Sequence, residues 1–327
     1  YPMCAGVERY VIAEVAAEEA AKARAAAIAH GSTGAGNDQI RFDVAFGVLA
    51  PRLPVLVPVR ELGLSRQAEL DWLSSNGFSA DFPKAEYSIN EGLWGTTIGG
   101  KETKGSMGLP PEHAYAKTVS IENAPEKGVE IEIAFEKGVP ISLNGQKLAP
   151  VALIDRLNAI AGEQGVGRGT HLGDTILGIK GRIAFEAPAA ITLIAAHREL
   201  EKLVLTKQQA QLKEAAGSQY AALLHEGLYF DPVGRDLEAL LSSSQQRVTG
   251  TVRAKLQKGS VIVIGSDSAY SLLSAKTAVY GEENRLWSGA EAAGFGKIWG
   301  MQSRLAGQAA KQDSVPGQTS GASKKSK

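Results

Sequence analysis

The sequence predicts an α/β region followed by an α+β region, and three observations lead to this prediction. Up to residue 78, helical and strand-like patterns alternate, which is typical of a parallel sheet with covering helices. Between residues 129 and 264, apolar and polar residues alternate around glycine-containing turns, which predicts hairpins among longer helices. Residues 290–310 then show the apolar spacing of an amphipathic helix.

The α/β region contains five predicted elements. Residues 11–29 are rich in Ala and Glu and predict a helix that runs into a short strand before Gly31. A second helix is expected over residues 37–49. Residues 55–59 form a short β-rich run bounded by prolines, and residues 65–73 have a Ser N-cap followed by the apolar spacing of a helix.

The α+β region begins with a predicted hairpin. Residues 129–135 alternate as one half-buried strand, Lys137-Gly138 forms the turn, and residues 139–143 return as the partner strand. Further patterns predict helices at residues 150–161, 188–205 and 207–225 and a second hairpin at residues 248–256 and 261–264.

A glycine-rich loop over residues 31–36 separates the first strand from the second helix. Such a loop exposes backbone N–H groups beside the positive end of a helix dipole, which suits a carboxylate or a phosphate. Asn37 and Arg41 share one face of the helix, with Asp38 one step around it. An amide, a carboxylate and a guanidinium together suit an amino-acid ligand. A lone glycine-rich loop is more often a simple turn, so further residues must decide.

Composition limits the partners. The chain has 327 residues with 35 basic and 35 acidic side chains, so its charge favours neither nucleic acid nor an anionic membrane. No apolar run approaches the roughly 20 residues of a membrane-spanning helix. The single cysteine, Cys4, permits no internal disulfide, which fits a reducing compartment. The five histidines lack metal-ligand spacing, so we expect no metal site formed by protein side chains alone.

The motif Gly-Ser-Thr-Gly-x-Gly-Asn-Asp-Gln-x-Arg-Phe at residues 31–42 resembles the aspartate and citrulline loop of the argininosuccinate synthase family. The resemblance covers nearly the whole chain. Its further matches, in order, lie at residues 87–95, 135–140, 165–168, 178–182, 196–201, 248–253 and 294–300.

This resemblance implies an ATP-dependent ligase of arginine biosynthesis. It would join citrulline to aspartate through a citrullyl-adenylate and release AMP and pyrophosphate, with Mg²⁺ on the phosphates of ATP. A cytoplasmic homotetramer is implied as well. The implied domains are the C-terminal part of an ATP-pyrophosphatase (adenine nucleotide alpha hydrolase-like) domain at 1–78, a synthetase and oligomerisation domain at 79–283, a helical arm at 284–311 and a disordered tail at 312–327. From its residues alone, the arm could equally be a helix folded back on its own domain.

The family's ATP loop, Ser-Gly-Gly-x-Asp, lies upstream of the aspartate loop and does not occur in this sequence. The chain begins at Tyr1, so we expect an incomplete chain that forms no argininosuccinate unless the missing portion is supplied. One alternative is an inert truncated homologue that only oligomerises or binds amino acids. Another ATP pyrophosphatase, such as an amidotransferase or a tRNA-modifying enzyme, would not share the matches over residues 87–304.

The resemblance also implies residues that bind ATP and aspartate. Gly31 would let the backbone approach ATP. Thr33, Asn37 and Asp38 would hold aspartate, with the Asp38 carboxylate facing the ammonium and orienting the amine for attack. Lys180 and Arg182 could face the phosphates, although solvated surface cations are the simpler interpretation.

The citrulline contacts implied by the resemblance are Tyr1, Asn37, Arg41, Ser88 and Thr97. Without it, Ser88 and Thr97 would be read as strand or turn hydroxyls bonded to the local backbone.

Three positions depart from the family pattern on the citrulline side. At the position of Gly6 the family has a Ser, at that of Gly173 it commonly has a Glu, and at that of Phe185 it has a Tyr. The missing Glu would leave an ammonium in the cleft without a carboxylate. Either the neighbouring Asp174 replaces it, or the enzyme accepts a citrulline whose α-amine is acylated and uncharged.

Overall fold

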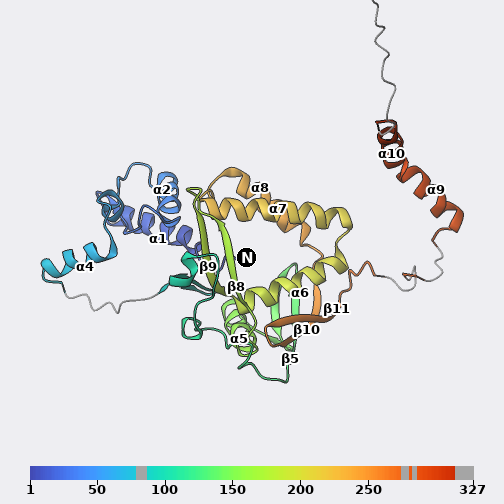
Figure 1. Cartoon of the computed structure of the whole chain (residues 1–327), viewed down its shortest axis with the longest axis horizontal. Coiled ribbons are helices and arrows are strands. Elements are labelled where there is room, and N and C mark those ends of the chain that lie inside the picture. Colours follow the sequence, from blue (N-terminus) through green and yellow to red (C-terminus); the bar gives the residue numbers. More distant parts are fainter. Residues whose placement is uncertain (79–86, 274–279, 282–285, 314–327) are drawn as a thin grey trace, which may run out of the picture. The chain divides into compact units, whose positions relative to one another are not determined.

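The predicted α/β region and α+β region are both present, and the fold-class prediction is confirmed (Figure 1). The computed structural model describes residues 1–78, 87–273, 280–281 and 286–313. By its internal contacts the chain divides into two units, Tyr1–Leu272 and Leu273–Lys327, which are described separately. Every helix among the described residues is too short or too polar to span a lipid bilayer.

The first 78 residues form short parallel strands with helices. The elements are α1 (Glu8–Lys22), β1 (Ile28–Ala29), α2 (Asp38–Leu49), β2 (Val55–Leu56), α3 (Pro58–Glu61) and α4 (Arg66–Ser75). β1 pairs with β2 in parallel, and Ala13, Ile28 and Phe46 pack together between the helices and this sheet.

Two boundaries in this region differ from the sequence prediction. The first helix ends at Lys22, several residues before the predicted short strand, which is present as β1, because Arg24 takes a positive φ of 51° and turns the chain. The predicted strand over residues 55–59 is cut to two residues, because Pro58 opens a short helix at a position that suits its fixed φ.

An antiparallel sheet carries the main core of the α+β region. Its strands are β5 (Val129–Glu136), β6 (Val139–Leu143), β7 (Gln146–Lys147), β10 (Gly250–Gln257) and β11 (Ser260–Asp267), in the order β11-β10-β5-β6-β7. The alternation predicted for β5 is confirmed, because Ile131, Ile133 and Phe135 are buried on one face. Helices α5 (Pro150–Glu163) and α6 (Pro188–Val204) cover that face and bury it (Figure 1).

A second antiparallel sheet was not predicted from the sequence. It has the order β3-β4-β9-β8 and consists of β3 (Tyr87–Gly92), β4 (Gly95–Gly100), β8 (Arg168–Asp174) and β9 (Lys180–Glu186). Glycines such as Gly99, Gly169 and Gly173 interrupt its apolar pattern, so the usual strand signal is weak. The remaining elements of this unit are the short 3₁₀ helices Lys101–Lys104 and Glu112–Ala114 and the helices α7 (Lys207–Glu226) and α8 (Pro232–Ser244).

In the described part of the second unit, two helices lie where one was predicted. α9 (Gly289–Trp299) starts with a capping box between Ser288 and Glu291, and α10 (Met301–Asp313) follows after Gly300. Phe295 and Trp299 stack at 5.5 Å between ring centroids and are both exposed within this chain. The predicted tail lies outside the described residues apart from positions 312 and 313, which belong to α10.

A buried carboxylate ties the second sheet to the loop that precedes β5. Glu186, at the end of β9, is fully buried. Its oxygens accept hydrogen bonds from the hydroxyls of Thr96 at 2.9 Å and Thr118 at 2.7 Å. They also accept from the backbone N–H groups of Ala116 at 3.0 Å and Lys117 at 2.8 Å. Because four donors surround it, the carboxylate is compensated in the interior.

We predict that Glu186→Ala lowers the free energy of unfolding by about 3 kcal/mol, because four donors lose their acceptor in a buried position. Urea denaturation followed by circular dichroism measures this change. The matched control is Glu132→Ala on the exposed face of β5, for which we expect less than about 0.5 kcal/mol. Equal effects of the two substitutions would contradict the assigned role of Glu186.

Candidate functional site

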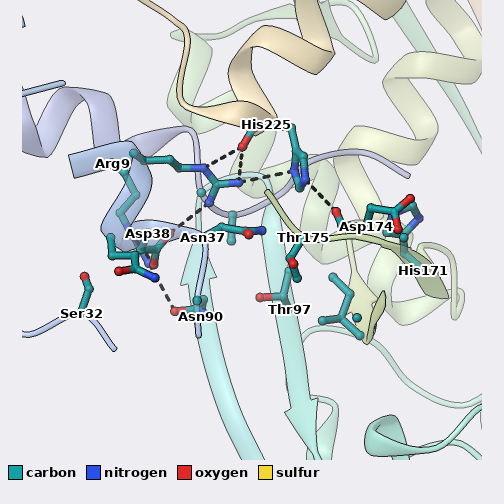
Figure 2. A pocket seen from close by; sticks show the side chains of 18 of the residues that line it. Arg9, Ser32, Asn37, Asp38, Asn90, Thr97, His171, Asp174, Thr175 and His225 are labelled. Atoms are coloured by element: carbon teal, nitrogen blue, oxygen red, sulfur yellow. Dashed lines mark hydrogen bonds and ion pairs between the residues drawn. The ribbon is translucent and has the colours of Figure 1, made fainter. Parts of the chain in front are cut away.

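A pocket of about 410 Å³ lies between the amino-terminal end of α2 and the second sheet (Figure 2). Its walls come from α1, the glycine-rich loop, α2, β3, β4, β8, β9 and the end of α7. The predicted site residues that line it are Tyr1, Thr33, Asn37, Asp38, Arg41 and Thr97. Side chains more than 90 positions apart in the sequence therefore meet at one cavity.

Two predicted residues are not part of the pocket lining. Ser88 is on the same face of β3 as Asn90 but pairs with Gly99, one pleat further from the cavity. Gly31 lies at the start of the glycine-rich loop, and a Cβ placed there would meet no atom within 4 Å. The backbone at Gly31 is therefore open to a close approach by a ligand.

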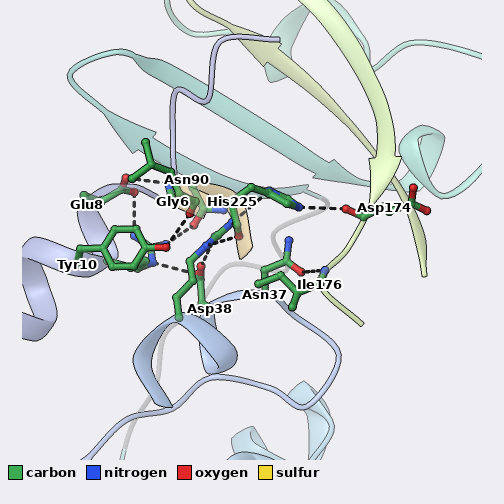
Figure 3. A network of polar contacts seen from close by, with 12 residues as sticks. Gly6, Glu8, Tyr10, Asn37, Asp38, Asn90, Asp174, Ile176 and His225 are labelled. Carbon is green, nitrogen blue, oxygen red and sulfur yellow. Dashed lines mark hydrogen bonds and ion pairs between the residues drawn. The ribbon is translucent and has the colours of Figure 1, made fainter. Parts of the chain in front are cut away.

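The carboxylate of Asp38 lies between two guanidinium groups (Figure 3). Oδ1 of Asp38 is 3.0 Å from Nη1 of Arg41, and Oδ2 is 3.0 Å from Nε of Arg9. Asp38 stands in the first turn of α2, where the helix dipole also favours a negative charge. The two ion pairs fix the position of this carboxylate in the pocket wall.

Arg9 was missed by the sequence analysis. It projects from α1, and its Nη2 donates to Oδ1 of Asn90 on β3 at 3.4 Å (Figure 2). Its Nη1 is paired with Glu8 at 2.8 Å. Arg9 thus links the helical region to the second sheet through Asp38 and Asn90, and no local spacing in the sequence could have indicated these long-range contacts.

Arg41 is held by the carboxyl-terminal end of α7. Its Nε and Nη2 donate to the backbone carbonyl of His225 at 3.2 and 3.0 Å, and Nη2 also faces Nδ1 of His225 at 3.4 Å. Nε2 of His225 then donates to the carbonyl of Asp174 at 3.1 Å. Arg41 is 6% exposed as a residue and its guanidinium is mostly paired, so its main effect is to fix Asp38 in place.

Asn37 connects α2 with the tip of the β8–β9 hairpin. Its side-chain Oδ1 accepts a hydrogen bond from the backbone N–H of Ile176 at 2.9 Å (Figure 3). Its amide nitrogen is the part of the side chain that can donate to a ligand, since the oxygen is already engaged.

The wall of the pocket opposite α2 is uncharged at its centre. Tyr1 stacks on His171 with ring centroids 4.4 Å apart, and Phe185 lies 5.3 Å from Tyr1. A Cβ placed on Gly173 would come within 2.5 Å of Nε2 of His171. The imidazole therefore fills the space that a side chain at position 173 would need. Burial lowers the pKa of His171, which favours its neutral form.

The two basic residues on β9 have partners within the protein. Lys180 is paired with the carboxylate of Asp174 at 2.6 Å, and Asp174 is 61% exposed at its side chain. Arg182 donates to the carbonyls of Gly105 at 3.1 Å and Gly108 at 2.7 Å. Lys180 thus belongs to an exposed ion pair, and Arg182 supports a loop.

Polar side chains of α2 and α3, which were not predicted from the sequence, hold the glycine-rich loop in place. Gln39 donates to the carbonyl of Gly34, and Arg60 donates to the side-chain oxygen of Gln39 at 3.1 Å. Arg60 is also paired with Asp43. These contacts hold the loop against α2 and α3 before any ligand binds.

Comparisons with known proteins identify the family. The family model described as "Arginosuccinate synthase N-terminal HUP domain" matches residues 1–79, and the one described as "Arginosuccinate synthase C-terminal domain" matches residues 87–306. The chain belongs to the argininosuccinate synthase family.

Similar members of the argininosuccinate synthase family occur in bacteria and archaea. The argininosuccinate synthase of Brevibacillus brevis is 42% identical over 312 residues, which cover 94% of this chain and 74% of the relative. The enzyme of Synechococcus elongatus is 44% identical over 306 residues, covering 93% and 76%. The enzyme of Methanocaldococcus jannaschii is 42% identical with the same coverage. The family resemblance read from the motifs is therefore confirmed.

The polar groups that line the pocket agree with the assignment to the argininosuccinate synthase family. Among the residues that the structure describes, no group of three or more His, Cys, Asp or Glu side chains could hold a metal ion. The polar groups of the pocket are instead hydroxyls, amides, guanidiniums and one central carboxylate, which are suited to amino acids.

Gly6 lies close to the guanidinium of Arg41. Its φ is +112°, and a Cβ there would lie 2.8 Å from Nη1 of Arg41. We predict that Gly6→Ala lowers the free energy of unfolding by about 2 kcal/mol, through the unfavourable φ and the displacement of Arg41. Gly47→Ala is the control, because Gly47 is inside α2 with open space around it and should gain about 0.5–1 kcal/mol. Urea denaturation measures both, and shifts of the same sign would contradict this account.

Proposed function

We propose that this protein ligates a citrulline-type acceptor to aspartate with the consumption of ATP, as part of arginine biosynthesis. The observation that carries the proposal is the carboxylate of Asp38, which lies in the pocket between Arg9 and Arg41 at 3.0 Å from each. Around it, the exposed N–H groups of the glycine-rich loop and the start of α2 suit the carboxylates of a small ligand.

Aspartate is proposed to bind at the α2 side of the pocket. Its ammonium faces the Asp38 carboxylate, and its carboxylates face Thr33, the amide nitrogen of Asn37 and the loop N–H groups. Binding of this kind places the amine at a fixed position and, once it is deprotonated, aims its lone pair toward the second substrate. Asp38 orients the amine and is the candidate acceptor of its proton.

The acceptor is proposed to bind between Tyr1, Thr97 and Arg41, with its α-amine free or acylated. Ser88, which lies one pleat beyond the lining, would reach it only by way of bound water or a longer ligand. Asn37 would contact both substrates, because it stands between the loop and the second sheet.

ATP supplies the activation that this reaction requires. The ureido oxygen of citrulline is a poor leaving group, and its adenylation with loss of pyrophosphate makes the carbon open to attack by the aspartate amine, with loss of AMP. The open backbone at Gly31 supports an approach of the nucleotide to this loop. Mg²⁺ is proposed to bind on the phosphates and not on side chains of this chain. The protein acts mainly by positioning and by fixed charges.

Assembly as a cytoplasmic homotetramer completes the proposal. The second unit supports it, since its helices expose Phe295, Ile298, Trp299, Met301 and Leu305 within this chain. Exposed apolar side chains at helical spacing are typical of a surface that packs on another subunit. The proposed domains are residues 1–78, 79–283, 284–311 and 312–327.

Because the family's ATP loop does not occur in this sequence, the activity is tested with a segment that supplies this loop. The protein is incubated with ATP, Mg²⁺, aspartate and citrulline or N-acetylcitrulline, and AMP is measured. AMP release that requires both amino acids supports the ligase. Binding of the amino acids without AMP release would instead favour a homologue that only binds them. Absence of any amino-acid binding by calorimetry would contradict the proposed site.

We predict that Asp38→Asn weakens aspartate binding at least tenfold, about 1.4 kcal/mol, because the ammonium loses its ionic partner. Isothermal titration calorimetry measures the dissociation constant. Glu18→Gln is the matched control, since it also neutralises one carboxylate but lies exposed on α1, outside the pocket lining. An unchanged dissociation constant in Asp38→Asn would exclude Asp38 as the ammonium partner.

A further inference from the structure

The carboxylates around the pocket are already engaged. Among the described residues that line it, the acidic side chains are Asp38 and Asp174. Each oxygen of Asp38 has a guanidinium nitrogen at 3.0 Å. The carboxylate of Asp174 is 2.6 Å from Lys180 and is largely exposed to solvent. Asp38 therefore stands on the α2 side of the cavity, and the other lining carboxylate, Asp174, forms an exposed ion pair.

Apart from Asp174 at the end of β8, the opposite wall presents uncharged groups. Thr97, Thr175 and Ile183 line it together with the glycines of β8 and β9, and His171 lies beside Asp174 (Figure 2). The imidazole stacks on Tyr1 and fills the space beside Gly173. Hydroxyls and an imidazole can donate and accept hydrogen bonds, but none of them compensates an ammonium as a carboxylate does.

Two amino-acid ligands bring two ammonium groups and three carboxylates into the cavity. The loop N–H groups, the Thr33 hydroxyl and the Asn37 amide provide for the carboxylates, and Asp38 provides for one ammonium. A second ammonium would face His171 and Tyr1, and the nearest acidic side chain on this wall, Asp174, is already paired with Lys180. An acylated α-amine has no charge, and its N–H and C=O can pair with the hydroxyls and the imidazole of this wall.

We propose, on the basis of the ligase function above, that the acceptor is a citrulline whose α-amine is acylated and that His171 determines this preference. The substrate class is therefore an N-acyl-citrulline. An acyl-transfer reaction on the α-amine must precede this ligation, and the product keeps the acyl group.

Calorimetry on the whole chain tests the proposal, with aspartate at saturation and N-acetyl-L-citrulline or L-citrulline as the titrant. We expect N-acetyl-L-citrulline to bind at least tenfold more tightly. Equal affinity, or tighter binding of L-citrulline, overturns the acylated acceptor and leaves the ligase proposal standing. If neither compound binds while the protein is folded by circular dichroism, both proposals fail.

A double substitution tests the role of His171. His171→Ala with Gly173→Glu removes the imidazole and places a carboxylate in the space that it vacates. Both substitutions are needed, because a Cβ at position 173 would collide with the imidazole of His171. We expect the affinity ratio to move at least tenfold toward L-citrulline. Leu172→Ala is the control on the same strand, since Leu172 is 61% exposed and does not line the pocket, and should leave the ratio unchanged. An unmoved ratio in the double variant, with aspartate binding retained, overturns the role of His171.

Discussion

The site depends on one electrostatic arrangement, the carboxylate of Asp38 held between the guanidiniums of Arg9 and Arg41. Each partner comes from a different part of the fold, since Arg9 is on α1 and Arg41 is on α2 next to the end of α7. Two like charges brought near each other in a partly buried space need an anion between them, and the dipole of α2 favours it at the same position. The pocket is therefore built around a fixed negative charge.

The scaffold explains why this arrangement can be maintained without a ligand. The carbonyl of His225 at the end of α7 accepts two hydrogen bonds from Arg41, and the tip of the β8–β9 hairpin is tied to Asn37. The hairpin itself is fastened at its other end by the buried Glu186. Ligand groups thus meet side chains that are already oriented, which lowers the entropic cost of binding.

The parts of the fold and of the site that depend on neighbouring residues in the sequence could be predicted from it. The loop and helix around Asn37, Asp38 and Arg41 carry their information within a few residues, and the alternation of β5 directly reports its buried face. Arg9 and His225 could not be found in this way, because they reach the site through contacts between distant segments. The second sheet was missed because its glycines leave little apolar pattern, although they allow the close packing against His171.

A crystal structure of the protein grown with aspartate tests the central claim most directly. The quantity to measure is the distance from the amine nitrogen of aspartate to the nearer carboxylate oxygen of Asp38. The account predicts a hydrogen bond of about 3 Å, with the ligand carboxylates on the glycine-rich loop. Aspartate bound outside this pocket, or with its amine turned away from Asp38, would contradict it.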